Sequence, residues 1–163
     1  MYRLILLCNL LFVSLSFSQN SIAEVLKKYN DNTVKYVYPK DLFKQKNAFY
    51  LDAREKKEFD VSHIKNSIYV GFDEFDSASF EKLNIDKNQK IIVYCSLGVR
   101  SEKIAKKLIS VGYTDVSNLY GGIFLWKNEK GTVVDTNNKI TENIHAFSIK
   151  WSVYLTSGIK VYN

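Results

Sequence analysis

Short apolar runs alternate with amphipathic segments along most of this chain. Five runs have the length and composition of extended, largely buried strands. They cover residues 34–38, 48–51, 68–70, 91–94 and 116–119. Strands that alternate with helices typically form a parallel sheet with helices on its faces. We therefore predict an α/β fold with a central, mostly parallel five-stranded sheet flanked by helices.

Helical patterns fill the gaps between these runs. Ser21 and Glu24 form a capping box, and the apolar positions from Ile22 to Tyr29 follow at helical spacing, so a helix is expected there. A longer helix is predicted from Ser101 to Val111, closed by Gly112. Shorter helices are expected after Pro39, over 55–59 and around 75–83.

The segment from Tyr94 to Ser101 carries the main candidate chemistry. Its sequence, Tyr-Cys-Ser-Leu-Gly-Val-Arg-Ser, places Cys95 where a strand gives way to a helix. Unpaired N–H groups at a helix N-terminus favour a thiolate and lower the pKa of a cysteine. Gly98 permits a tight loop and Arg100 adds a positive charge. Cys95 is therefore a candidate nucleophile beside an anion-binding loop.

The N-terminus has the form of a secretory signal peptide. Arg3 precedes an apolar stretch from Leu4 to Phe17, and Ser16 and Ser18 suit a cleavage site after Ser18. The stretch is short for a membrane span, so no stable membrane insertion is expected after cleavage. A lipid anchor on Cys8 is disfavoured by the bulky residues before it. We expect an exported protein, periplasmic or secreted.

Composition and charge narrow the function classes. The chain has 163 residues, enough for one catalytic domain, and a formal net charge of +6. Its lysines are scattered rather than clustered, which favours a solvated surface over nucleic-acid binding. Of its two cysteines, only Cys95 would remain after cleavage. That excludes an internal disulfide framework and a cysteine-cluster metal site, and no metal is expected.

Four motifs, taken together, resemble those of the rhodanese-like domains. Cys95 to Arg100 resembles the family's Cys-x-x-Gly-x-Arg loop, and Leu51 to Glu55 its Asp-x-Arg motif. Residues 58–68 resemble its segment around Gly-His-Ile, with Ser62 in place of the glycine. The stretch from Gly121 to Trp126 resembles its closing Gly-Gly motif. The predicted segments are a signal peptide (1–18), an N-terminal helix (19–33), a rhodanese-like domain (34–130) and a C-terminal extension (131–163).

The resemblance implies a sulfurtransferase that works through a persulfide on Cys95. Arg100 would act with Cys95, and the substrate-binding loop would comprise Ser96, Leu97, Gly98, Val99 and Ser101. The expected partners are a small anionic sulfur donor such as thiosulfate and an acceptor thiol or cyanide. No cofactor is expected. Ser96 stands where the family often has arginine, which weakens the case for thiosulfate itself.

Supporting roles fall to Asp52, Arg54, Glu58 and His63. Asp52 could bond the backbone of the active loop, because both lie at strand ends. Arg54 and Glu58 are four residues apart and are interpreted as a structural ion pair. His63 is expected to make structural hydrogen bonds.

Two other functions stay open. Phosphatases and arsenate reductases of related fold use a Cys-x5-Arg loop. Only four residues separate Cys95 from Arg100 here, so the loop encloses a narrower anion-binding space. A non-enzymatic binding or regulatory module is the stronger alternative, although such modules usually lack the cysteine.

The C-terminal extension lies outside the resemblance. Ile144, Phe147, Trp151 and Leu155 recur at helical spacing, which predicts an appended helix ending before Gly158. It could pack on the domain or bind a protein partner.

Overall fold

The computed structural model describes residues 21–45 and 47–162. The expected signal peptide, its cleavage site and Cys8 lie outside these ranges. Within them, no helix has the length and apolar character needed to cross a membrane.

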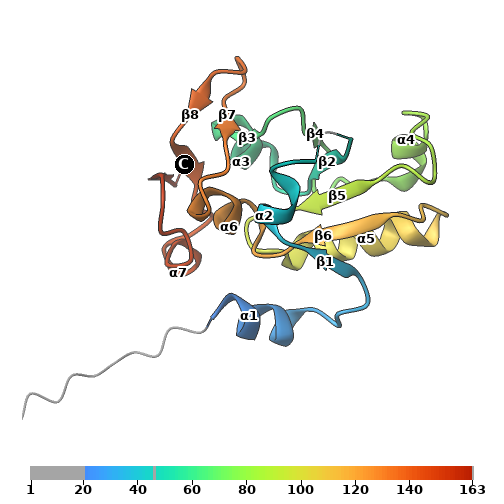
Figure 1. The fold of residues 1–163 in the computed structure, drawn as a ribbon, viewed down its shortest axis with the longest axis horizontal. Helices are drawn as coiled ribbons and strands as arrows, with labels where there is room; N and C mark the ends of the chain where they lie inside the picture. Colours follow the sequence, from blue (N-terminus) through green and yellow to red (C-terminus); the bar gives the residue numbers. More distant parts are fainter. Residues whose placement is uncertain (1–20, 46, 163) are drawn as a thin grey trace, which may run out of the picture.

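A five-stranded sheet forms the centre of the fold (Figure 1). Its strands run in the order β1-β6-β5-β2-β4, and every pair of neighbours is parallel. They span Lys35–Val37 (β1), Phe49–Asp52 (β2), Ile68–Tyr69 (β4), Ile91–Tyr94 (β5) and Val116–Leu119 (β6). The predicted α/β architecture is thus confirmed.

The central strand β5 divides the core into two layers. All four of its residues are buried, and successive side chains point to opposite faces of the sheet. Ile91 and Val93 join one hydrophobic cluster, while Ile92 and Tyr94 join the other. Such a strand needs a helical layer on both faces, and the chain supplies both.

Six of the helices in the described part of the chain accompany the sheet. They span Ile22–Tyr29 (α1), Pro39–Leu42 (α2), Lys56–Val61 (α3), Ser77–Glu81 (α4), Val99–Ser110 (α5) and Gly122–Asn128 (α6). Helix α5 runs beside β5 and β6 and buries Ile104, Ala105 and Leu108 in one cluster (Figure 1). Helices α1, α2 and α6 contribute to the other.

Two helix predictions differ in outcome, and a third helix was missed. The capping box of α1 is confirmed, because Ser21 Oγ accepts from the Glu24 N–H and Glu24 accepts from the Ser21 N–H. Helix α5 begins at Val99, two residues earlier than predicted, because Gly98 serves as its N-cap at a φ of 109°. Helix α6 was not predicted from the sequence.

The C-terminal extension does not form the predicted helix. Ile144 lies in β9 (Asn143–His145), which pairs in parallel with β10 (Ile159–Val161), and α7 covers only Ile149–Ser152. Phe147 has a φ of 62°, which interrupts any helix through this segment. Its apolar spacing reflects burial of Ile144 and Leu155 in the core rather than one helical face. The prediction of a helix from Ile144 to Leu155 was therefore wrong.

A small antiparallel sheet joins the extension to the domain. It comprises β3 (His63–Ile64), β7 (Val133–Val134) and β8 (Ile140–Thr141) in that order. Both residues of β7 are buried, so the extension is packed into the fold rather than appended to it.

Candidate functional site

Cys95 lies directly after β5, at the start of a loop that leads into α5. Its side chain is buried, with the residue 2% exposed. The Gly98 N–H donates to the sulfur at 3.1 Å, and the Ser101 hydroxyl lies 3.5 Å from it. Burial by itself would raise the pKa of Cys95, but the charge of Arg100 and these hydrogen bonds outweigh it and lower the pKa below its ordinary value. The site therefore favours a thiolate.

Two asparagines hold the active loop in place. The Gly98 carbonyl accepts from the side-chain amides of Asn30 (3.0 Å) and Asn118 (2.8 Å). The Ser101 hydroxyl lies 2.7 Å from the other end of the Asn118 amide, so it can donate to that oxygen or to the sulfur of Cys95, one at a time. Sequence reasoning missed both asparagines. The position of Asn118 on β6, beside β5, was the available signal.

The N-terminus of α6 supports the loop from behind. The N–H groups of Ile123 and Phe124 donate to the carbonyls of Cys95 (2.9 Å) and Ser96 (3.2 Å). A β-carbon at Gly122 would lie 2.2 Å from the Cys95 carbonyl oxygen, so only glycine fits there. This close approach explains the second glycine of the Gly121-Gly122 pair in the sequence motif.

Arg100 is bound by Glu58 rather than left free. Its guanidinium donates to both carboxylate oxygens of Glu58, at 2.7 and 2.9 Å, and to Ser96 Oγ at 3.1 Å. Ser96 in turn donates to Glu58 at 2.9 Å. Burial would raise the pKa of Glu58, but the paired Arg100 lowers it to about 2. The predicted ion pair between Glu58 and Arg54 was therefore wrong.

Arg54 pairs with Asp52 instead. Both side chains are fully buried, with Nη2 2.6 Å from Oδ2 and Nε 2.9 Å from Oδ1. Arg54 also donates to the Ser62 carbonyl at 2.7 Å. Asp52 accepts the Arg54 backbone N–H and its guanidinium, so its expected bond to the active-loop backbone is replaced by this pair. Arg54 lies in the bend that follows β2, two residues after Asp52, and this bend brings the two side chains together.

His63 lies in β3, with Nδ1 3.1 Å from the Phe59 carbonyl oxygen. Its ring stacks on that of Phe59, with centroids 3.9 Å apart. These contacts fit the structural part expected of it. Among the described residues, no group of three or more histidine, cysteine or acidic side chains could hold a metal ion.

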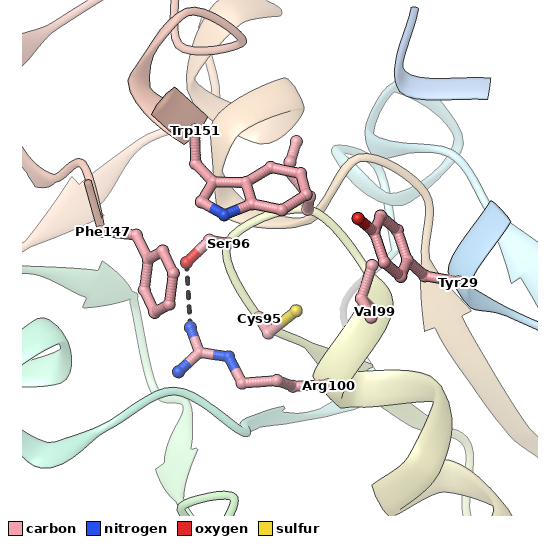
Figure 2. A pocket seen from close by; sticks show the side chains of 8 residues that line it. Tyr29, Cys95, Ser96, Val99, Arg100, Phe147 and Trp151 are labelled. Atoms are coloured by element: carbon pink, nitrogen blue, oxygen red, sulfur yellow. Dashed lines mark hydrogen bonds between the residues drawn. The ribbon is translucent and has the colours of Figure 1, made fainter. Parts of the chain in front are cut away.

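A pocket of about 270 Å³ opens above the sulfur (Figure 2). Its lining consists of Tyr29, Cys95, Ser96, Leu97, Val99, Arg100, Phe147 and Trp151. Figure 2 shows Phe147 and Trp151 on one side of the active loop and Tyr29 on another. The Arg100 guanidinium lies 4.9 Å from the centre of the Phe147 ring. Sequence reasoning did not place Tyr29, Phe147 or Trp151 at this site.

Cys95 thus lies at the carboxyl end of the central strand of a parallel α/β sheet, which is where such sheets bind ligands. The Rhodanese-like domain family matches residues 37–129, more than half of the chain. The chain belongs to the rhodanese-like domain family.

Proteins of known name or structure are similar to parts of this chain. A tRNA uridine(34) hydroxylase of Bacillus cereus is 40% identical over 97 residues, which are 56% of this chain and 30% of the relative. The matched region thus spans less than a third of this curated relative. A rhodanese-related protein of Thermoplasma volcanium is 28% identical with a TM-score of 0.53, covering 61% of this chain and 97% of that one. A thiosulfate sulfurtransferase of Pseudomonas aeruginosa, 22% identical with a TM-score of 0.55, shares the fold over 63% of this chain and 20% of its own.

Proposed function

We propose that this protein is a sulfurtransferase that carries a sulfane sulfur as a persulfide on Cys95. The observation that supports this most directly is the environment of the sulfur. Cys95 has a lowered pKa, a hydrogen bond from the Gly98 N–H and an open pocket above it. A buried structural cysteine needs none of these features.

In the first half-reaction, the Cys95 thiolate attacks the outer sulfur of a donor such as thiosulfate. A bond forms between the two sulfur atoms, and the donor's own sulfur–sulfur bond breaks. Sulfite leaves with the bonding electron pair, and Cys95 becomes a persulfide. In the second half-reaction, an acceptor thiolate or cyanide attacks the terminal sulfur and restores the Cys95 thiolate.

The loop supports both steps electrostatically. The N–H of Gly98 and the hydroxyl of Ser101 point at the sulfur and can stabilise negative charge there. Arg100 holds the loop through Ser96 and Glu58 while contributing positive charge near Cys95. Its role in this scheme is to position the loop and favour the thiolate.

The test is intact mass spectrometry of the purified protein before and after incubation with thiosulfate and with an organic thiosulfonate. We expect a gain of one sulfur atom that is removed by cyanide or a reducing thiol. The Cys95→Ser variant should gain nothing. If neither donor adds sulfur to folded protein, the binding-module alternative replaces this proposal.

Hydroxylation of tRNA uridine 34, the activity in the name of the Bacillus cereus relative, is a weaker candidate function for this chain. The shared region is 30% of that protein, so most of the relative has no counterpart in the match. A comparison of tRNA-modifying activity with persulfide formation in the same preparation would separate the two.

We also propose that the protein is exported. The support is the apolar stretch from Leu4 to Phe17 after Arg3, with small residues at Ser16 and Ser18. Cell fractionation and N-terminal sequencing test it. A mature protein that begins at Gln19 is expected, and a full-length protein recovered from the cytoplasm would contradict it.

A further inference from the structure

The pocket above Cys95 has walls that the family match does not include. Tyr29 belongs to α1, and Phe147 and Trp151 belong to the C-terminal extension, all outside residues 37–129. The ring centroids of Tyr29 and Trp151 are 6.0 Å apart in an edge-to-face arrangement. These two segments, far apart in sequence, therefore meet at the rim of the pocket.

The surface offered to a substrate is mainly apolar. Tyr29, Phe147 and Trp151 supply rings, and Leu97 and Val99 supply aliphatic groups from the active loop itself. A concave, apolar surface of this size suits a small organic group rather than a hydrated inorganic ion. Burial of an apolar substrate group here would be favourable, because it removes the apolar surfaces of the group and of the pocket from water.

The charges near the Cys95 sulfur also favour an organic donor over an inorganic anion. Glu58 binds the Arg100 guanidinium through both oxygens, and a Glu55 carboxylate oxygen lies 3.6 Å from it. The charge of Arg100 is thus partly compensated before any substrate arrives. Ser96 adds no charge to the loop. A doubly charged anion such as thiosulfate gains little from this arrangement, whereas a singly charged donor with an apolar body gains from the walls.

Phe147 is held over the loop by strained backbone. Its φ of 62° is rare for a bulky side chain, and its N–H donates to His145 Nδ1 at 3.2 Å. Backbone strain of this kind persists only where the surrounding packing holds the residue in place, and it is concentrated at functional sites. The result is an aromatic ring 4.9 Å from the Arg100 guanidinium, facing the pocket although half exposed.

We propose that the α1 helix and the C-terminal extension select organic sulfur donors, with an alkyl or aryl body that packs between Tyr29, Phe147 and Trp151. This rests on the proposed function and names its substrate class. The Cys95 thiolate attacks the terminal sulfur of an organic thiosulfonate, and the donor's sulfur–sulfur bond breaks. The sulfinate leaves with the electron pair, and Cys95 becomes a persulfide anion, so charge and atoms balance.

The experiment compares methane-, propane- and butanethiosulfonate, which share one anionic head group and differ only in the apolar body. The kcat/KM for loading of Cys95 is divided by the rate constant for each donor with free cysteine, which removes intrinsic reactivity. Each buried methylene should raise this ratio about four-fold. Thiosulfate should be the poorest donor.

Variants of the aromatic pocket residues test whether these residues cause the rise in corrected kcat/KM with donor length. Trp151→Ala and Phe147→Ala should flatten the rise to less than about two-fold per methylene. Ile149→Ala, in the same helix as Trp151 but 80% exposed and outside the pocket lining, is the matched control and should keep the parental slope.

The outcomes separate the two proposals. If the parent protein loads all three thiosulfonates with equal corrected kcat/KM, the selection of organic donors is overturned while sulfur transfer stands. If no donor loads Cys95, the proposed function and this inference both fail. The parental series needs no variant, so a variant that does not fold leaves the test intact.

Discussion

The pairing of Glu58 with Arg100 predicts a specific loss of stability in acid. The Glu58 side chain is 1% exposed and that of Arg100 is 16% exposed, so water screens this pair weakly. The pKa of Glu58 falls from an ordinary value of 4.5 to about 2 in the folded protein, because Arg100 outweighs the opposite effect of burial. At about 1.4 kcal/mol for each pKa unit, the carboxylate contributes roughly 3 kcal/mol to the free energy of unfolding at neutral pH.

The stabilisation by Glu58 is lost in acid because the pKa of its carboxyl group is lowered in the folded protein. A carboxyl group whose folded pKa is depressed stabilises the fold above its unfolded pKa, and this contribution is lost as pH falls from 4.5 towards about 2. About 2 kcal/mol of it should be gone at pH 3, by the same linkage relation.

The Glu58→Gln variant keeps the shape of the side chain but resembles the protonated acid at every pH. We therefore expect it to be about 3 kcal/mol less stable than the parent at pH 7, with the gap narrowing to about 1 kcal/mol at pH 3. The assay is urea unfolding followed by circular dichroism across this pH range.

Glu74→Gln is the matched control, because Glu74 is exposed. It should follow the parent closely at every pH. The reasoning is refuted if Glu58→Gln and the parent lose the same free energy of unfolding between pH 7 and pH 3.

Three further changes, one of them paired with a control at Gly112, test the active loop. Ser101→Ala removes a hydrogen bond that lowers the pKa of Cys95, so the midpoint of its alkylation rate against pH should move upward; an unchanged midpoint would discount the hydroxyl. Gly122→Ala forces a β-carbon to within 2.2 Å of a backbone carbonyl and should cost more than about 3 kcal/mol in urea unfolding. Gly112→Ala, whose β-carbon would meet nothing within 4 Å although its φ of 95° is more positive than the 54° of Gly122, should cost about 1–2 kcal/mol, and equal losses would contradict the steric explanation. Arg100→Lys keeps the charge but loses the two-pronged contact with its carboxylate, so sulfur transfer should fall about ten-fold or more, and parental kinetics would show that a point charge suffices.

Local sequence patterns were sufficient for the sheet and for the position of the thiol. The run from Ile91 to Tyr94 is apolar on both faces, which is typical of a central strand, and the run from Val116 to Leu119 has apolar residues at both ends. A glycine three residues after Cys95 marks the loop by itself, because its φ of 109° is readily available only to glycine. Strand length, helix caps and tight turns depend on residues close together in the chain.

The choice of charge partners was decided by tertiary structure. Spacing alone favours Arg54 with Glu58, because residues four apart share one side of a helix. Arg54 instead lies in the bend between β2 and α3, where its side chain meets Asp52. Glu58 is free to meet Arg100, 42 positions later, once α3 and α5 come together.

The walls of the pocket likewise depend on the assembled fold. The apolar spacing from Ile144 to Leu155 indicates burial, but it does not say which surface each side chain meets. Pairing of β9 with β10 and the positive φ of Phe147 override the helical pattern and bring Phe147 and Trp151 over Cys95. The local sequence motif is thus enough to predict the nucleophile. Its surroundings depend on contacts between segments that only the folded chain brings together.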